Sequence, residues 1–498
     1  MIEKYYSGVI EQIYNRIGKE TRNIVMANYS NDFSIENLEV IRRYQSNEDN
    51  VFFAYSEFSY NTLVGAYEPF LDIICNMHRR FIGGSFDDFQ KECGVYYLHR
   101  QVLNSYYETG ECFREETVLL NEVAYEQRRM TMAIADMLKK LSEVKPLMIV
   151  INRFQMASKS SIETIKYLID NPCANIGIVL GVNALVKGAD STVEVWDSIV
   201  ESLEDRSAVY YIGSAGQLKN TVKTTNDDEM YITMNFEQSI QEASNIMEFL
   251  DFEQAKRGCR IIEHKLKFED AWIDEKSLRR FYMVYARTSV LLGEMSKAIE
   301  LTNEFKALIP ENDSEHYLSL YYFMKGTCYM YQGKLEKAGN SAKSAYDYAV
   351  LAEDDILIFK AELLSVMIKM SGWYNIFFCV QDIPVSDEII EKLIKHGYRN
   401  YLAHIYIYAY DNSRDVVKQS FYDESLLKHF TKGLELAKEI GNEQLVYDAY
   451  QKIIMLASTT GLNEIAFLYV IRTYEFMKGH GNISVSYTHL TLPTNSRV

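Results

Sequence analysis

The sequence predicts an α/β domain with a parallel sheet, followed by an all-α solenoid of paired helices. Two observations lead to this fold class. In the first 235 residues, short apolar runs alternate with helical patterns, which is typical of parallel strands joined by helices. From about residue 236 no convincing strand follows, and a Gly and Ala spacing recurs at about 40 residues. We therefore expect an α/β domain at 1–235 and a solenoid at 236–480.

Length, charge and hydropathy limit the classes of protein that the chain can belong to. At 498 residues it is too long for one ordinary core. Its net charge of -17 argues against direct contact with nucleic acid, which needs clustered Lys and Arg. No run of about 18 apolar residues occurs, and the start lacks the apolar core of a signal peptide. We expect a cytoplasmic protein without a membrane partner.

Cysteine and histidine are spaced without a metal-binding pattern. The seven cysteines include no C-x-x-C pair, which favours reduced core thiols over disulfides or zinc ligands. The nine histidines show neither H-x-x-x-H nor H-E-x-x-H, so surface or internally bonded histidines are favoured over a metal site. The sequence predicts no metal centre.

The first domain begins with alternating helical and strand patterns. Apolar residues at helical spacing predict helices at 1–20 and 35–44, and shorter apolar runs predict strands at Ile24–Ala27 and from Val51. A helix is predicted after Pro69, and a helical hairpin is predicted over about 86–142.

The segment Pro146–Ser158 organises this domain. Leu147–Ile151 is an unbroken apolar run, as expected for a strand buried on both faces of a parallel sheet. The next segment predicts a helix capped by Ser160 with Glu163. Its apolar stripe consists of Ile162, Ile165, Leu168 and Ile169. Further strands are predicted at Ile176–Asn183 and Ala208–Gly213, with a helix near 193–204 between them.

The second domain is predicted from small residues at a fixed spacing. Gly293 precedes Ala298 by five residues, and the same spacing recurs at Gly333 with Ala338, at Gly461 with Ala466 and, more weakly, at Gly372 with Phe377. Small residues at these points let two helices of a hairpin pack closely. These segments resemble tetratricopeptide repeats, and an irregular α-domain is the alternative. Tyrosine clusters at helical spacing favour core packing over a ligand-binding stripe.

The last fourteen residues, 485–498, differ in composition from everything before them. They resemble the translation of a sequencing adapter, and a genuine β-like tail is the alternative. If the segment is an artefact, the natural protein continues beyond residue 484 with a C-terminal domain.

The order of segments over the first 210 residues resembles the ATPase domain of the STAND class, as in large LuxR-type bacterial regulators. The aromatic-rich segment YSEFSYNTLVGAYEPFLDII, from Tyr55, matches the family's pattern before a Pro-Phe-Leu helix start. PLMIVINRFQMAS matches the family's acid-ending strand, and IGIVLGVN matches the strand with a polar end. The resemblance implies a P-loop after the first strand.

The expected P-loop has lost its chemistry. A working loop needs glycines that cradle phosphates, a Lys for the outer phosphates and a Ser or Thr on magnesium. Over the segment NYSNDFSI the equivalent positions hold other residues: Asn28, Asn31 and Phe33 for the glycines, Ser34 for the lysine and Ile35 for the magnesium ligand.

The second half of the implied site is changed too. Asn152 replaces the acid that would hold magnesium, and Arg153 replaces the acid that would help to activate water. An amide carries no charge for the metal, and an arginine cannot act as a base. Alternatively, Arg153 pairs with an acid and substitutes structurally for the lost charges.

These losses predict a pseudo-ATPase that is not an enzyme and needs no cofactor, with weak ATP or ADP binding left open. The alternative is that no nucleotide site existed here at all. The resemblance implies a bacterial transcriptional regulator whose solenoid binds a protein, peptide or small ligand, and it allows for self-association. DNA would be bound only by the missing C-terminal domain. The rival interpretation is a repeat scaffold or a sensor for an enzymatic output domain such as a nucleotide cyclase.

Overall fold

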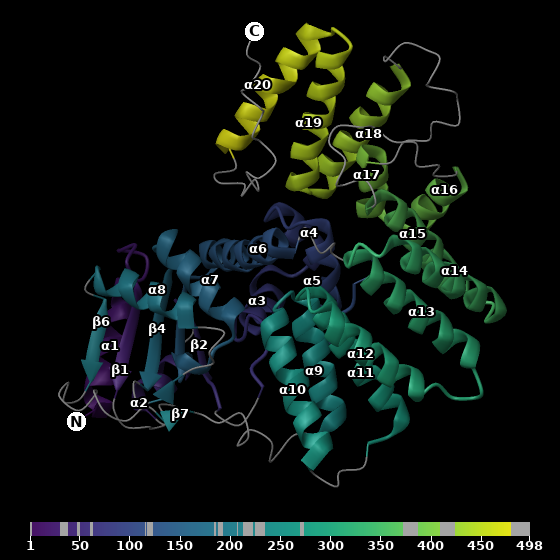
Figure 1. Ribbon diagram of the computed structural model, residues 1–498. Helices are drawn as coiled ribbons and strands as arrows, with labels where there is room; N and C mark the ends of the chain where they lie inside the picture. Colours follow the sequence, from purple (N-terminus) through teal and green to yellow (C-terminus); the bar gives the residue numbers. More distant parts are fainter. Residues whose placement is uncertain are drawn as a thin grey trace, which may run out of the picture. The chain divides into compact units, whose positions relative to one another are not determined.

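The chain forms two compact units. The first consists of Met1–Val95, His99–Arg114 and Leu119–Leu301, and the second of Tyr96–Leu98, Glu115–Val118 and Thr302–Val498. The computed structural model (Figure 1) describes residues 2–29, 38–46, 50–59, 63–114, 116, 123–183, 186–187, 193–206, 208–212, 223–224, 235–268, 273–371, 387–408 and 424–479. Most of the predicted P-loop, the Gly372 repeat and the 485–498 tail lie outside these residues.

The first unit contains a five-stranded, fully parallel sheet with the order β2-β3-β4-β1-β6. Its strands are β1 (Ile24–Tyr29), β2 (Phe52–Glu57), β3 (Leu147–Asn152), β4 (Ile176–Asn183) and β6 (Val209–Ile212). Two short strands, β5 (Val186–Lys187) and β7 (Lys223–Thr224), form a second sheet. The predicted parallel sheet is confirmed, and β1 extends two residues beyond its predicted end.

Helices connect the strands. They are α1 (Ile2–Arg16), α2 (Glu39–Ser46), α3 (Phe70–Met77), the π-helical turn η1 (His78–Ile82), α4 (Phe86–Glu92), α5 (Tyr97–Thr109), α6 (Val123–Val144), the 3-10 turn η2 (Phe154–Met156), α7 (Lys159–Asp170) and α8 (Val193–Glu204). The predicted hairpin at 86–142 is instead three helices, α4, α5 and α6, and Gly94, with a positive φ of 71°, follows the end of the first. The predicted helix at 193–204 has the bounds of α8.

β3 lies at the centre of the domain core. Every residue from Leu147 to Asn152 is buried. Alternate residues of a strand point to opposite faces, and Met148 and Val150 join a cluster with Tyr6, Ile10 and other residues of α1 on one face. Among the other helices of this unit, α6 packs against α7, and α7 packs against α8. The sheet is thus covered by helices, as its apolar sequence requires.

The helix after β3 begins differently from the prediction. The predicted cap formed by Ser160 and Glu163 is wrong, because Ser158 is the N-cap and its hydroxyl accepts a hydrogen bond from the Ser161 amide. The Ser160 hydroxyl instead accepts from the amide of Tyr67, 3.0 Å away. The predicted apolar stripe of α7 is buried in full.

No strand occurs among the described residues after position 236, so the predicted all-α region is confirmed there. Its helices are α9 (Phe236–Glu248), α10 (Phe252–Phe268), α11 (Glu275–Leu291), α12 (Met295–Ala307), α13 (Ser314–Tyr331), α14 (Leu335–Leu351), α15 (Asp355–Ser371), α16 (Asp387–His396), α17 (Arg399–Tyr408), α18 (Glu424–Ile440), α19 (Glu443–Thr459) and α20 (Asn463–Gly479). Sequence neighbours pack as pairs, such as α13 with α14 and α19 with α20. Within the described ranges, none of the helices combines the length and hydrophobicity needed to cross a bilayer.

The repeated glycines and alanines of these pairs have separate roles. Ala298 and Ala338 are fully buried, so these small residues do allow close helix packing. Gly293, Gly333 and Gly461 have a positive φ of 77°, 70° and 74°, and a Cβ at any of them would meet nothing within 4 Å. The glycines are needed for the left-handed turn that ends each helix, and not for packing as predicted.

The second unit includes two short segments from the N-terminal half of the chain. The carboxylate of Glu116 accepts hydrogen bonds from the amides of Asn400 (3.2 Å) and Tyr401 (2.9 Å) in the first turn of α17. The Tyr96 hydroxyl donates to the side-chain oxygen of Asn400 at 2.6 Å, and Asn442 donates to the same oxygen at 2.9 Å. These residues form a buried polar cluster inside the unit.

Candidate functional site

The carboxyl ends of the parallel strands bring four polar residues to one edge of the sheet. Tyr29 of β1 pairs in register with Asn183 of β4, and Glu57 of β2 pairs with Asn152 of β3. In open α/β sheets, ligands bind outside this edge. The predicted site residue Asn152 lies at this edge, at the carboxyl end of β3.

Asn152 is held by an internal hydrogen bond. It is fully buried, and its Oδ1 atom accepts from the Tyr29 hydroxyl at 2.6 Å. A second phenol, that of Tyr6 from α1, is also fully buried close by. Burial raises the pKa of Tyr6 well above its ordinary value, and nearby Tyr29, Tyr55 and Glu57 raise it further, so the phenol stays neutral. The neutral Tyr6 phenol and the Asn152 amide therefore lie together at the end of the central strands.

Arg153 forms an ion pair with an acid on the neighbouring strand β2. It has a left-handed backbone with a φ of 55°, directly after β3. Its guanidinium lies 3.0 Å from a carboxylate oxygen of Glu57 and donates to the backbone oxygen of Phe58 at 3.3 Å. Both side chains are mostly buried, with 20% and 15% exposed. The ion-pair role considered for Arg153 is the one found, and the carboxylate that it neutralises also accepts a hydrogen bond from Tyr55.

The remaining predicted site residues are not brought together in the described structure. Asn28 belongs to strand β1, where it pairs with Val182, rather than to a loop. The other P-loop positions, Asn31, Phe33, Ser34 and Ile35, lie outside the described residues. The prediction about them is therefore untested.

Glu57 and Tyr29 are the site residues that sequence reasoning missed. Each is the last residue of its strand. An acid near the end of the strand predicted from Val51 was a usable signal, because the carboxyl ends of parallel strands meet at one edge. Gln155 was missed too, and its side-chain oxygen accepts from the Asn183 amide at 3.2 Å. In the part of the chain that the structure describes, no three metal-ligating side chains lie close enough to hold a metal ion.

Among solved structures, the chain is similar to a signalling protein with a repeat sensor. The crystal structure of a STAND (signal transduction ATPase with numerous domains) protein with a tetratricopeptide repeat sensor, from Pyrococcus horikoshii, is 11% identical. The alignment covers 94% of this chain and 82% of that chain, with a TM-score of 0.41. No protein-family model and no curated protein matches the sequence.

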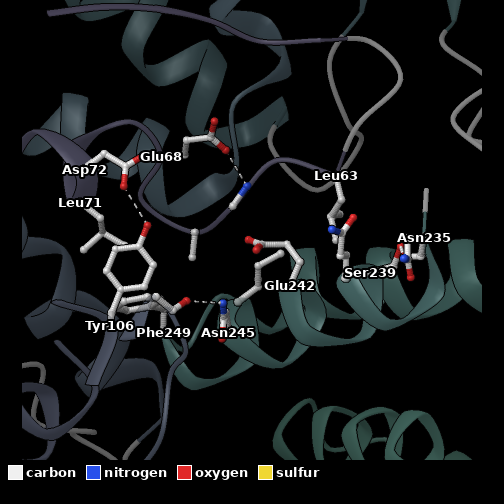
Figure 2. Close-up of a pocket in the computed structure, with 15 residues that line it drawn as sticks. Leu63, Glu68, Leu71, Asp72, Tyr106, Asn235, Ser239, Glu242, Asn245 and Phe249 are labelled. Carbon is white, nitrogen blue, oxygen red and sulfur yellow. Dashed lines mark hydrogen bonds between the residues drawn. The ribbon is translucent and has the colours of Figure 1, made fainter. Parts of the chain in front are cut away.

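A second location in the first unit is a cavity of about 520 Å³ that the sequence did not indicate. One wall is a face of α9, and the others are the 63–72 segment with the start of α3, and Tyr106 with Gly110 around α5. Figure 2 shows Glu242 projecting from α9 toward the side of the cavity where Glu68, Asp72 and Tyr106 lie. The cavity thus gathers three carboxyl groups from separate elements.

Two of these carboxylates have hydrogen-bond donors, while Glu242 has none among the described residues. Glu68 accepts from the Gly65 amide at 2.9 Å, and Asp72 accepts from the Tyr106 hydroxyl at 2.9 Å. Burial raises the pKa of Glu242 to about 7, and the charges of Glu68 and Asp72 add to the shift. Glu242 therefore changes its charge near neutral pH.

Replacing Glu242 with glutamine is expected to stabilise the protein at alkaline pH. The folded pKa of about 7 lies above the ordinary value of 4.5, so the folded state binds the proton more tightly and wild-type stability falls as pH rises from about 5 to 8. The neutral amide introduced by E242Q does not suffer this loss. Allowing for partial exposure, we expect E242Q to be about 2 kcal/mol more stable at pH 8 and nearly equal to wild type at pH 5.

Urea unfolding at the two pH values measures this difference. Glu253, an exposed acid on α10, provides the charge-matched control E253Q, which should keep the wild-type pH dependence. Equal stability of E242Q and wild type at pH 8 would contradict the raised pKa.

Proposed function

We propose that this chain is a non-hydrolysing signalling protein whose paired helices bind a protein, peptide or small ligand. The observation that carries the proposal is that two residues at the carboxyl edge of the sheet are held by internal contacts. Arg153 is paired with Glu57, and Asn152 is bonded to Tyr29. These contacts take up the two positions at which ATP hydrolysis would require acids.

The chemistry of the edge supports the loss of hydrolysis. Magnesium that carries a nucleotide is held by carboxylates, and the attacking water needs an oriented base or acceptor. The Asn152 oxygen already accepts from a phenol, and the Glu57 carboxylate lies against a guanidinium. Neither group is arranged to hold a cation or to accept a proton, so we propose that the α/β domain has a structural or assembly role and needs no cofactor.

The helix pairs supply the binding function in this proposal. Stacked helix pairs present extended surfaces that repeat proteins use for recognition, and the buried alanines of α14 show how closely this stack packs. The finer proposal, a LuxR-like bacterial transcriptional regulator with a DNA-binding output domain, rests on the sequence resemblance described above. Sequencing the uninterrupted gene past codon 484 tests this finer proposal. A catalytic domain encoded there would favour the alternative, a sensor for an enzymatic output domain.

ATP turnover and binding test the loss of hydrolysis. We expect the purified chain to release no phosphate above background, and to bind ATP no more tightly with Mg²⁺ than without it. The N152A variant identifies the source of any residual turnover: activity that disappears in this variant belongs to the sheet edge and contradicts the proposal. Activity that persists unchanged comes from a contaminant.

A further inference from the structure

The cavity beside α9 has the size and the mixed lining of a ligand site. Its volume of about 520 Å³ falls within the roughly 300–1,000 Å³ range of small-molecule sites. Of its fifteen lining residues, seven have polar or acidic side chains, and the other eight are apolar, aromatic or glycine. The apolar and aromatic part consists of Leu63, Ala66, Leu71, Tyr106, Ile246 and Phe249.

The cavity extends along one face of α9. The residues that this helix and its caps contribute are spaced by three or one positions, as a single helical face requires: Asn235, Gln238, Ser239, Glu242, Asn245, Ile246 and Phe249. At a rise of about 1.5 Å per residue this face is about 20 Å long. In Figure 2, Asn235, Ser239 and Leu63 lie toward one end, and Tyr106, Phe249 and Asp72 toward the other. An elongated molecule fits this shape better than a compact one.

The charge of the cavity is of one sign. None of the fifteen lining residues is basic, whereas three are acids. Tyr106 adds no charge, because burial raises the pKa of its phenol, which donates a hydrogen bond to Asp72. The Cys112 thiol near Glu242 is likewise kept neutral, since burial raises its pKa. The cavity therefore favours a positively charged occupant.

Glu242 is the acid that an occupant would contact. Its Oε1 atom lies 3.0 Å from the point where a Cβ on Gly65 would be, so the carboxylate reaches the opposite wall. No described side chain donates to it or forms an ion pair with it, although it is largely buried. An ionised carboxylate in such a place is costly without a counter-charge.

We infer that this cavity binds a small organic cation with an aliphatic body, whose ammonium or guanidinium group pairs with Glu242 while its carbon chain lies against Leu63, Leu71 and Phe249. A metal ion is a poorer fit, because no described residues form a metal-ligating group of three. The aromatic rings of Tyr106 and Phe249, whose centroids are 5.5 Å apart, provide a further attraction for an organic cation. The cavity is separate from the sheet edge, and the inference does not depend on the function proposed for that edge.

Calorimetric titration of the full chain with agmatine and spermidine tests the inference. We expect saturable binding that is up to about tenfold tighter at pH 8 than at pH 6, because Glu242 is mostly ionised only at the higher pH. Near pH 6.5, binding should release up to one proton per site, measured by comparing buffers of different ionisation enthalpy. Mg²⁺ at the same concentration should not compete.

Three variants test whether the cation binds in this cavity. E242Q should weaken binding at least tenfold and abolish the proton release, whereas the charge-matched E253Q on α10 should leave both unchanged. D72N alters an exposed acid at the other end of the cavity and should weaken binding by a smaller factor, which provides a test if E242Q folds poorly. Absence of binding at pH 8, equal binding by E242Q and wild type, or equal competition by Mg²⁺ overturns the inference.

Discussion

Replacing Gly181 with alanine is expected to lower the free energy of unfolding of the first unit by about 3 kcal/mol. Gly181 lies in β4, and an added Cβ would be 2.2 Å from the Tyr6 hydroxyl oxygen and 2.9 Å from Oδ1 of Asn152. Both neighbours are fully buried, so neither can move away without disturbing the core. Hydrogen exchange of the β4 amides measures the loss.

A second substitution tests the cause of this effect. Y6F removes the hydroxyl that clashes and keeps the ring that packs edge-on against Tyr29. The double variant Y6F/G181A should therefore be more stable than G181A alone, which is a departure from additivity that a double-mutant cycle detects. Strictly additive losses would show that the strain lies elsewhere in the strand.

Replacing Glu116 with alanine is expected to destabilise the second unit by about 3 kcal/mol. Its two carboxylate oxygens accept from two amides in the first turn of α17, where helices have unsatisfied donors and a partial positive charge. Glu116 and Asn400 are fully buried, so water cannot take over these hydrogen bonds. Urea unfolding and hydrogen exchange of α17 measure the effect.

Glu111 provides the matched control for this variant. It is an exposed acid on the same connecting segment, and E111A should change stability by less than about 0.5 kcal/mol. If E116A unfolds no more easily than E111A, the carboxylate is not a helix cap that the unit depends on. The E116Q variant should also be destabilised, since its amide group would face one of the two N-H donors.

The parts of the fold that the sequence predicted well are those set by local pattern. The unbroken apolar run Leu147–Ile151 is typical of a buried strand, and α8 and β4 have the predicted bounds because their apolar patterns are interrupted on both sides. The cap of α7 was predicted wrongly because three serines close together compete for the role. The tertiary contact with the Tyr67 amide decides which hydroxyl is free to cap.

The candidate sites could not be predicted in full, because they depend on contacts between residues that are distant in the sequence. Tyr29 and Asn152 are 123 positions apart, and no local pattern indicates that a phenol ends β1 beside the end of β3. Asn152 and Arg153, at positions where the resemblance implies acids, were visible in the sequence, but their neighbour Glu57, which pairs with Arg153, is visible only once β2 is known to lie beside β3. The cavity was missed because Glu68, Asp72 and Glu242 each lie in ordinary helical or loop patterns.

The polar cluster around Asn400 has a consequence for how the protein is made. Tyr96 and Asn400 are 304 positions apart, and Glu116 precedes its partners on α17 by 284 and 285 positions. During synthesis these two N-terminal residues leave the ribosome long before the helices that they contact. The second unit therefore completes its packing late, and a fragment that starts at residue 302 would lack the cap of α17 and the phenol at its centre.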